Sequence, residues 1–273
     1  VTGIDKLMEE RAAISLSPEL ESVEHKLADV KRTLAERADK AKRAEQQKND
    51  LVVYLAHDIK TPLTSVIGYL SLLDETPDMP DEEKAKYIHT AWEKANRLRT
   101  LVNEFFEITR SHSEVLPLQK TKVDLYYMIA QISDELYPQL NACGKIIENH
   151  VDEDISVYGD SDKLARVFNN ILKNAISYSE ENSVIKVSAR ELSEWTVIQF
   201  ENDGEIPEDK LNVIFDKFCR LSNARLSETG GSGLGLAIAK NIIVLHGGQI
   251  RAESSNGRTA FIIEIPSASS DCH

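Results

Sequence analysis

The apolar residues in the first part of the chain recur in steps of three and four, the spacing that predicts a helix. Between residues 20 and 34 this spacing is typical of the seam of a coiled coil, which needs a partner helix. The alternative is a solvated helix that packs on its own chain. The seam consists of Leu20, Val23, Leu27, Val30 and Leu34. A long helix is therefore predicted over most of residues 1–48.

A second apolar stripe at helical spacing predicts a helix over residues 49–74. At about 100° per residue, His57 and Thr61 fall on the side opposite this stripe and are expected to be exposed. Pro62 lies inside the helix and cannot donate a backbone hydrogen bond, so a bend is expected beside His57. The stripe consists of Val52, Leu55, Ile59, Leu63, Val66, Leu70 and Leu73.

Two prolines, Pro77 and Pro80, end this helix, and another helix follows them. Its stripe consists of Ile88, Ala91, Ala95, Leu98, Val102 and Phe105. Two antiparallel helices with narrow stripes bury them best as part of a four-helix arrangement. The first part of the chain is therefore predicted to form an α-helical dimeric four-helix bundle, with two helices from each chain.

From residue 121 onward helical and strand patterns mix, which predicts an α/β sandwich with one layer of helices on a mixed sheet. Helices are predicted over residues 125–143, 160–178, 207–214 and 233–246. Strands are predicted over residues 122–125, 146–150, 184–192, 196–201, 249–253 and 258–265. Residues 267–273 are expected to be a disordered tail.

Composition narrows the classes of function. The 273 residues include 32 Lys and Arg against 45 Asp and Glu, and a net charge of −13 argues against nucleic acid as a partner. Cys143, Cys219 and Cys272 show no Cys-x-x-Cys spacing, so neither a disulfide framework nor a zinc site is supported. No apolar run approaches the ~20 residues of a membrane helix, so these residues are expected to be soluble as they stand.

The first candidate for chemistry is His57, which is followed directly by Asp58. A neutral imidazole can attack a phosphoryl group through one nitrogen while a carboxylate accepts a hydrogen bond from the other. A surface histidine without a role is the alternative. Asn170 and Asn174 form the second candidate, because two amide oxygens on one helix flank suit Mg²⁺ with bound phosphates. A plain polar flank explains that spacing equally well.

Two further motifs suit a nucleotide. A glycine-rich run, residues 230–235, precedes a helix pattern, and such a loop turns free N–H groups toward phosphates. It lacks the ending of a P-loop and the preceding strand of a dinucleotide fingerprint. At the end of the strand before it, Asn202, Asp203 and Gly204 offer side-chain acceptors for an adenine amino group and a close approach for the base.

The order of these motifs is more specific than any one of them. A histidine, paired asparagines, a strand-end acceptor, Phe-x-x-Phe and a glycine-rich loop resemble the H, N, G1, F and G2 boxes of bacterial sensor histidine kinases. Residues 51–70 further resemble the VanS-type sensors that control vancomycin resistance. The resemblance implies a dimerisation and phosphotransfer domain over residues 49–115 and a catalytic ATP-binding domain over residues 121–266. Residues 1–48 resemble part of a HAMP signal-relay module.

The resemblance also implies roles for single residues. His57 would be phosphorylated from Mg-ATP, Asp58 would be the general base, and Thr61 would serve dephosphorylation of a response regulator. Asn174 would coordinate Mg²⁺, with Asn170 in support. The other implied nucleotide-binding residues are Asn202, Asp203, Gly204, Phe215, Phe218, Arg220, Gly231, Gly233, Leu234 and Gly235. The fragment would belong to a homodimeric receptor at the cytoplasmic face of the cell membrane, anchored through an N-terminal segment outside this sequence.

Two departures from the family pattern leave questions open. The G1 motif has one glycine, Gly204, and an amide, Asn202, where the family has an aspartate, so either Asn202 or Asp203 is expected to read the base. Asp58 stands where glutamate is commoner. Two alternatives remain: a gyrase-like or chaperone-like ATPase, which would carry a glutamate in place of Asn170, and a degenerate kinase that serves as a regulator-binding scaffold.

Overall fold

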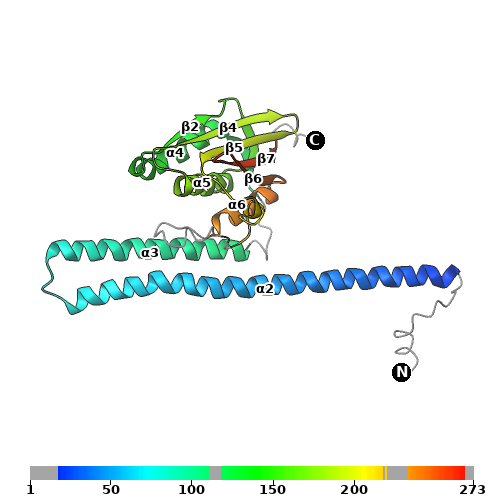
Figure 1. Cartoon of the computed structure of the whole chain (residues 1–273), viewed down its shortest axis with the longest axis horizontal. Helices are drawn as coiled ribbons and strands as arrows, with labels where there is room; N and C mark the ends of the chain where they lie inside the picture. The colour runs from blue at the N-terminus through cyan, green and yellow to red at the C-terminus, as the bar shows by residue number, and fades with distance from the viewer. Residues whose placement is uncertain (1–17, 111–117, 218, 220–232, 268–273) are drawn as a thin grey trace, which may run out of the picture. The chain divides into compact units, whose positions relative to one another are not determined.

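The computed structural model describes residues 18–110, 118–217, 219 and 233–267. The chain divides into two units, residues 1–56 and 57–273. Two helices precede the mixed part of the chain: α2 (Pro18–Glu75) and α3 (Asp81–Arg110) (Figure 1). The described residues include no helix that is both long and apolar enough to cross a membrane.

The helical hairpin follows the predicted pattern at its turn. Pro77 and Pro80 lie between the two helices, and α3 begins with acidic residues that suit the positive end of a helix. The two helices contact each other through aromatic rings, since Tyr69 and Tyr87 have centroids 5.6 Å apart. Pro62 lies within α2 and is buried.

The apolar side chains of this hairpin divide into two faces rather than the predicted single stripe. Ala91 and Leu101 are buried, while Ile88 is exposed and Trp92 is 63% exposed. The exposed face comprises Leu63, Ile67 and Leu70 on α2 and Ile88, Trp92 and Phe106 on α3. On each helix these residues recur every three, four or seven positions, or a multiple of these, so they share one side. We call them the exposed apolar face.

The rest of the chain forms the predicted α/β sandwich. Five strands pair in the order β2-β4-β5-β7-β6; the β2–β4 pair is parallel and the other pairs are antiparallel. Helices α4, α5 and α6 lie on one face of this sheet (Figure 1). The elements are α4 (Leu125–Ala142), β2 (Ile146–His150), α5 (Ser161–Tyr178), β4 (Val184–Leu192), β5 (Trp195–Asp203), α6 (Gly235–Leu245), β6 (Gln249–Ser255) and β7 (Arg258–Pro266).

A separate two-stranded sheet pairs β1 (Lys120–Asp124) with β3 (Ser156–Asp160), a strand that the sequence pattern does not predict. Each of the two strands ends in an aspartate that caps the next helix. Asp124 Oδ1 accepts a hydrogen bond from the N–H of Tyr127 at the start of α4, and Asp160 Oδ1 accepts one from the N–H of Lys163 in α5. These caps satisfy N–H groups that the helices leave free.

The core lies between the sheet and the helices. Phe168 of α5 and Phe200 of β5 are fully buried, with ring centroids 5.5 Å apart. The apolar residues of α5 that face the sheet recur every three or four positions, which explains why the pattern predicts this helix well. The buried residues of α5 are Leu164, Val167, Phe168, Ile171, Leu172, Ala175 and Ile176.

Two predictions need correction. The helix predicted over residues 207–214 is only a 3₁₀ turn, η1 (Glu208–Lys210), followed by turns, because eight residues give too few hydrogen bonds to offset helix nucleation. The segment is held instead by burial of Ile214 and Phe215. Ser267, placed in the tail, is buried, and its N–H donates to the Glu194 carbonyl. The rest of the tail lies outside the described residues.

Candidate functional site

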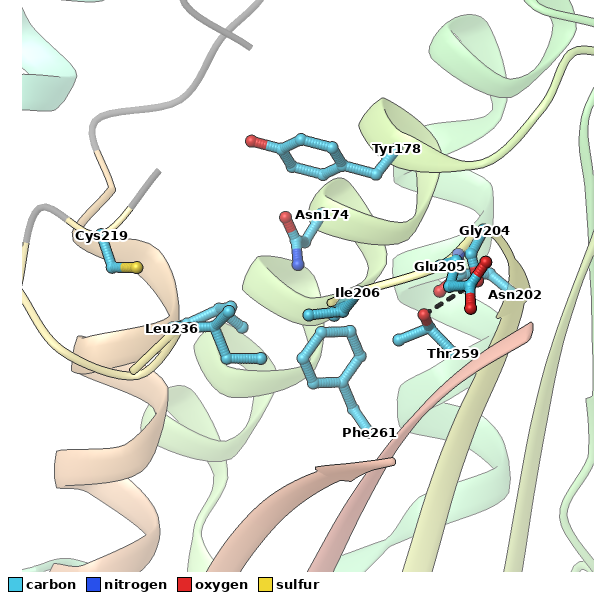
Figure 2. A pocket seen from close by; sticks show the side chains of 11 residues that line it. Asn174, Tyr178, Asn202, Gly204, Glu205, Ile206, Cys219, Leu236, Thr259 and Phe261 are labelled. Carbon is cyan, nitrogen blue, oxygen red and sulfur yellow. Dashed lines mark hydrogen bonds between the residues drawn. The ribbon is translucent and has the colours of Figure 1, made fainter. Parts of the chain in front are cut away.

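An open cleft lies between α5, the start of α6 and the ends of β5 and β7 (Figure 2). Its empty space is about 620 Å³, part of which is open solvent. It is lined by Asn174, Tyr178, Asn202, Gly204, Glu205, Ile206, Ile214, Cys219, Leu236, Thr259 and Phe261. An apolar floor with a few polar groups is typical of a nucleotide-base site.

The turn after β5 requires its single glycine. Gly204 has φ +133°, and a Cβ there would lie 3.2 Å from the Tyr178 carbonyl oxygen. Its N–H donates to the Gly257 carbonyl at 2.8 Å, and its own carbonyl accepts from the Thr259 hydroxyl at 3.0 Å. Figure 2 shows the latter bond at one end of the cleft. This turn is therefore held on both sides although the second glycine of the family pattern is missing.

The two strand-end candidates lie in different places. Asn202 lines the cleft and is only 5% exposed, and its Nδ2 donates to the Asp203 carbonyl at 2.7 Å. That bond assigns the amide nitrogen, so Oδ1 is the atom left to accept from a ligand. Asp203 does not line the cleft, and its carboxylate lies 3.9 Å from Nε of Arg258. The geometry thus favours Asn202 as the residue that faces a bound base.

The two predicted asparagines of α5, Asn170 and Asn174, also lie in different places. Asn174 lies in the cleft, and in Figure 2 its amide lies beneath the ring of Tyr178. Asn170 does not line the cleft; its Nδ2 donates to the carbonyl of Gly235 at 3.1 Å and so joins α5 to the first residue of α6. The two residues are thus more than a polar flank, because one meets the cleft and the other fixes its border.

Phe215 and Leu234 lie behind the cleft and do not line it. Phe215 packs edge-on against Phe261, with centroids 6.3 Å apart, and Nζ of Lys240 lies 5.7 Å from its ring centroid. Leu234 is fully buried. Phe215 thus contacts the cleft residue Phe261 and Leu234 belongs to the core, while their contact with nucleotide stays a prediction.

Cys219 brings a thiol to the cleft. Burial, and secondly the negative charge of Asp216, raises the pKa of this thiol above its usual value. The group is therefore neutral near pH 7 and a weak nucleophile.

Sequence reasoning missed several residues that line the cleft: Tyr178, Glu205, Ile206, Ile214, Cys219, Leu236, Thr259 and Phe261. Two of them carried a usable signal. Thr259 and Phe261 are two residues apart in a strand, so they point to the same side of the sheet. Taking the inward-facing residues of the strand predicted over residues 258–265 as candidates would have included both of them.

The remaining predicted residues lie partly outside the described chain. His57 falls within the backbone of α2, but the position of its side chain is not described. Next to it Asp58 is half-buried, and one turn on Thr61 is exposed, as expected. Gly233 adopts φ +73°, a conformation that favours glycine. Phe218, Arg220 and Gly231 lie outside the described residues.

Comparisons with known proteins agree with this arrangement. Residues 47–114 match the His Kinase A (phospho-acceptor) domain, and residues 159–269 match the family described as histidine kinase-, DNA gyrase B-, and HSP90-like ATPase. The chain is 60% identical to the sensor protein VanS of Enterococcus faecium, over 97% of its own length and 69% of that protein's. The chain belongs to the VanS-like sensor histidine kinases.

Other relatives extend the same family. The sensor protein VanSC of Enterococcus gallinarum is 38% identical over 97% of this chain and 74% of its own. A crystal structure of the histidine kinase ThkA in complex with a response regulator protein, TrrA, is 27% identical, with a TM-score of 0.65, and the match covers 81% of this chain and 62% of that one. The Acinetobacter baumannii histidine kinase AdeS, 24% identical with a TM-score of 0.63 over 77% of this chain and 97% of its own, shares the fold.

Family membership bears on the two alternatives that the sequence left open, a gyrase-like or chaperone-like ATPase and a degenerate kinase that serves as a scaffold. As a member of this family, the chain is an ATP-dependent histidine kinase. The match to the phospho-acceptor domain favours a kinase over a gyrase-like ATPase. The cleft beside Asn174 and Asn202 lies within the matched ATPase-type region.

Proposed function

We propose that this kinase binds Mg-ATP in the cleft of the α/β domain and transfers the γ-phosphoryl group to His57. The phosphoryl group then passes to an aspartate of a response regulator that controls glycopeptide resistance. The observation that carries this proposal is the meeting of Asn174, Asn202 and Gly204 at one cleft, although they come from segments far apart in the sequence. Each matches a position of the kinase motif order.

The base-binding end of the cleft suits adenine. Oδ1 of Asn202 accepts from the exocyclic amino group, while Nδ2 stays bonded to the Asp203 carbonyl. The bare Cα of Gly204 lets the base approach the backbone. Tyr178, Ile206 and Phe261 supply apolar surface for the ring. An aspartate is therefore not required at position 202 for this contact.

The residues present also fit a magnesium ion. Within the described ranges no group of three or more His, Cys, Asp or Glu side chains is placed to hold a metal, so the ion would rely on amide oxygen, phosphate oxygens and water. Asn174 would supply the amide oxygen, and Asn170 would support it by holding Gly235. When bound, Mg²⁺ neutralises charge on the phosphates during transfer.

At the other end of the reaction, His57 and Asp58 prepare the acceptor. In this proposal the Asp58 carboxylate would accept a hydrogen bond from one ring nitrogen of His57, and the other nitrogen would attack phosphorus. As the N–P bond forms and the bond to the leaving ADP oxygen breaks, the carboxylate stabilises the positive charge on the ring. Because Asp58 is shorter than glutamate, it must lie closer to the ring.

The kinase is further proposed to act as a homodimer at the cytoplasmic face of a membrane, anchored by a segment outside this sequence. The exposed apolar face of α2 and α3 supports dimerisation, since a single hairpin leaves Trp92 and Leu70 in water. Thr61, exposed one turn after His57, is proposed to orient a water molecule for dephosphorylation of the regulator. Thr61→Ala should then keep autophosphorylation and lose most acceleration of phospho-regulator decay.

The decisive experiment is incubation of the full chain with labelled ATP and Mg²⁺, followed by measurement of phosphate that is labile in acid and stable in base. His57→Gln should abolish this label while ATP affinity stays nearly unchanged. His89→Gln is the matched control, because His89 is an exposed histidine of the same hairpin and should label like the parent. Label that persists in His57→Gln would refute the assignment.

A further inference from the structure

A buried histidine stands at the end of α6 that is farther from the cleft. His246 is 3% exposed, and both of its ring nitrogens are engaged. Nδ1 donates to the Ile242 carbonyl at 2.8 Å, and Nε2 accepts from the backbone N–H of Asp160 at 3.0 Å. A backbone N–H can only donate and a carbonyl can only accept, so the ring is neutral with its proton on Nδ1.

The partner of this ring, Asp160, joins three segments. Its carboxylate caps α5 through the N–H of Lys163 and also accepts from the N–H of Gln119 beside strand β1. Its backbone N–H binds the His246 ring. Asp160 is itself largely buried, so all three bonds are sheltered from water and none is easily replaced by solvent.

The ring lies directly against the backbone of β3. A Cβ at Gly159 would lie 3.0 Å from Cδ2 of His246 and 2.6 Å from Cδ1 of Leu164. A side chain at this position would require Leu164 to move and would press on the ring. The local sequence is thus suited to holding this ring in one place.

Helices α5 and α6 are therefore linked at two points. Asn170 binds the Gly235 carbonyl beside the cleft, and Asp160 binds His246 at the opposite end. Along α5 the two points are about 15 Å apart, and along α6 about 16 Å, at 1.5 Å per residue. Because the two spans match, the two links tie the packed helices together at two separate points along their length.

We propose that neutral His246 is a positioning residue for the kinase: its bond to Asp160 holds α6 in register with α5 and thereby keeps Gly235 and Asn170 together at the border of the nucleotide cleft. The inference rests on the proposed binding of ATP in that cleft. His246 does not touch the cleft, so it acts only through the two helices.

Protonation would break this link, because Nε2 could no longer accept from Asp160. The charges near the ring are Lys120 on β1, Lys163 on α5 and Asp160 itself. Burial first, and then the two lysines, lowers the pKa of His246, while the Ile242 carbonyl and Asp160 raise it. The ring therefore stays neutral at pH 7.5, and the link weakens only at pH values below the ordinary pKa of histidine.

The test measures ADP binding to the full chain by calorimetry, and the KM for ATP and kcat of autophosphorylation at pH 7.5. His246→Leu removes both ring bonds and should raise KM and the ADP Kd about tenfold, with kcat at saturating ATP changed less than about twofold. His246→Gln keeps one acceptor and one donor, so it should restore most of the affinity. Circular dichroism checks that each variant is folded.

A pH series separates positioning from a loss of fold. Between pH 7.5 and 5.5 the ADP Kd of the parent should rise more than that of His246→Gln, which cannot titrate. His150→Gln is the matched control, since His150 lies exposed on β2 and this change should leave the pH dependence as in the parent. If His246→Leu is unfolded, this comparison of the parent with His246→Gln decides alone.

The outcomes distinguish the two proposals. A parent chain that binds no ADP or ATP would overturn the proposed nucleotide site itself. A parent that binds while folded His246→Leu binds equally well, or His246→Gln that follows the parent's pH dependence, would overturn the role of His246 alone.

Discussion

The helical hairpin and the α/β domain solve the burial of apolar surface in opposite ways. In the α/β domain the central helix α5 covers its apolar residues against the sheet of the same chain. In the hairpin, Leu63, Ile67 and Leu70 on α2 stay exposed and lie on one side of that helix, and Trp92 on α3 is exposed as well. One region is complete by itself, whereas the other requires a second surface, so their stabilities should respond to different perturbations.

The largest expected effect is on association. Leu70→Asp removes a leucine from the proposed dimer twice, once in each copy, and adds two charges, so dissociation should become easier by at least about 5 kcal/mol. Sedimentation should show a monomer at micromolar concentration, with the α/β domain still folded. Leu72→Asp is the matched control, because Leu72 is also exposed but lies on the opposite side of α2. A dimer that survives Leu70→Asp would contradict the proposed interface.

The next effect should be confined to the α/β domain. Phe168→Ala removes a fully buried ring beside Phe200 and should lower the free energy of unfolding of this domain by about 3–5 kcal/mol. Denaturant titration followed by circular dichroism would measure the change, and the loss should not depend on protein concentration. Tyr137→Ala, at an exposed site on α4, should change the same quantity by less than about 0.5 kcal/mol.

A third effect sharpens the comparison within the same domain. Lys145 is buried, and its Nζ donates to the carbonyls of Ile176 at 2.6 Å and Ser179 at 2.8 Å, near the C-terminal end of α5. Lys145→Met leaves these carbonyls without their donor, so unfolding should become easier by about 2 kcal/mol. Thermal unfolding would show a lower Tm. Lys122→Met, at an exposed site, should leave Tm almost unchanged. Equal shifts of Tm in both variants would contradict the role of Lys145 at the end of α5.

These contrasts also explain what the sequence could and could not predict. The pattern of local apolar spacing predicts residues 160–178 as a helix, and α5 spans Ser161–Tyr178. The same kind of evidence misses β3, because its five residues become a strand only by pairing with β1, which is distant in the sequence. It also assigns a helix to residues 207–214, where burial of two side chains and not local propensity decides the conformation.

The candidate site shows the same limit. The motif order identifies Asn174, Asn202 and Gly204, and all three line one cleft. It places Phe215 and Leu234 in the same set, but a list of motif positions cannot tell a lining residue from one behind the lining. Tyr178 was missed because it joins the cleft only through the packing of α5 against the G1 turn. The sequence thus predicts which residue types belong to the site, but it does not predict which of them line the cleft and which are buried next to it.

The smallest expected effect is a difference in the alkylation rates of two cysteines, one exposed and one partly buried, with no change in stability. Cys143 is exposed, whereas Cys219 is partly buried in the cleft, where burial and then Asp216 raise the pKa of its thiol. Only the thiolate reacts with iodoacetamide, so at pH 7.5 Cys219 should be alkylated several-fold more slowly than Cys143. Asp216→Asn removes the negative charge, lowers that pKa and should speed alkylation of Cys219 alone. ADP should slow it further by filling the cleft. Mass spectrometry of the two peptides would measure both rates, and equal rates in the parent chain would show that Cys219 is not enclosed.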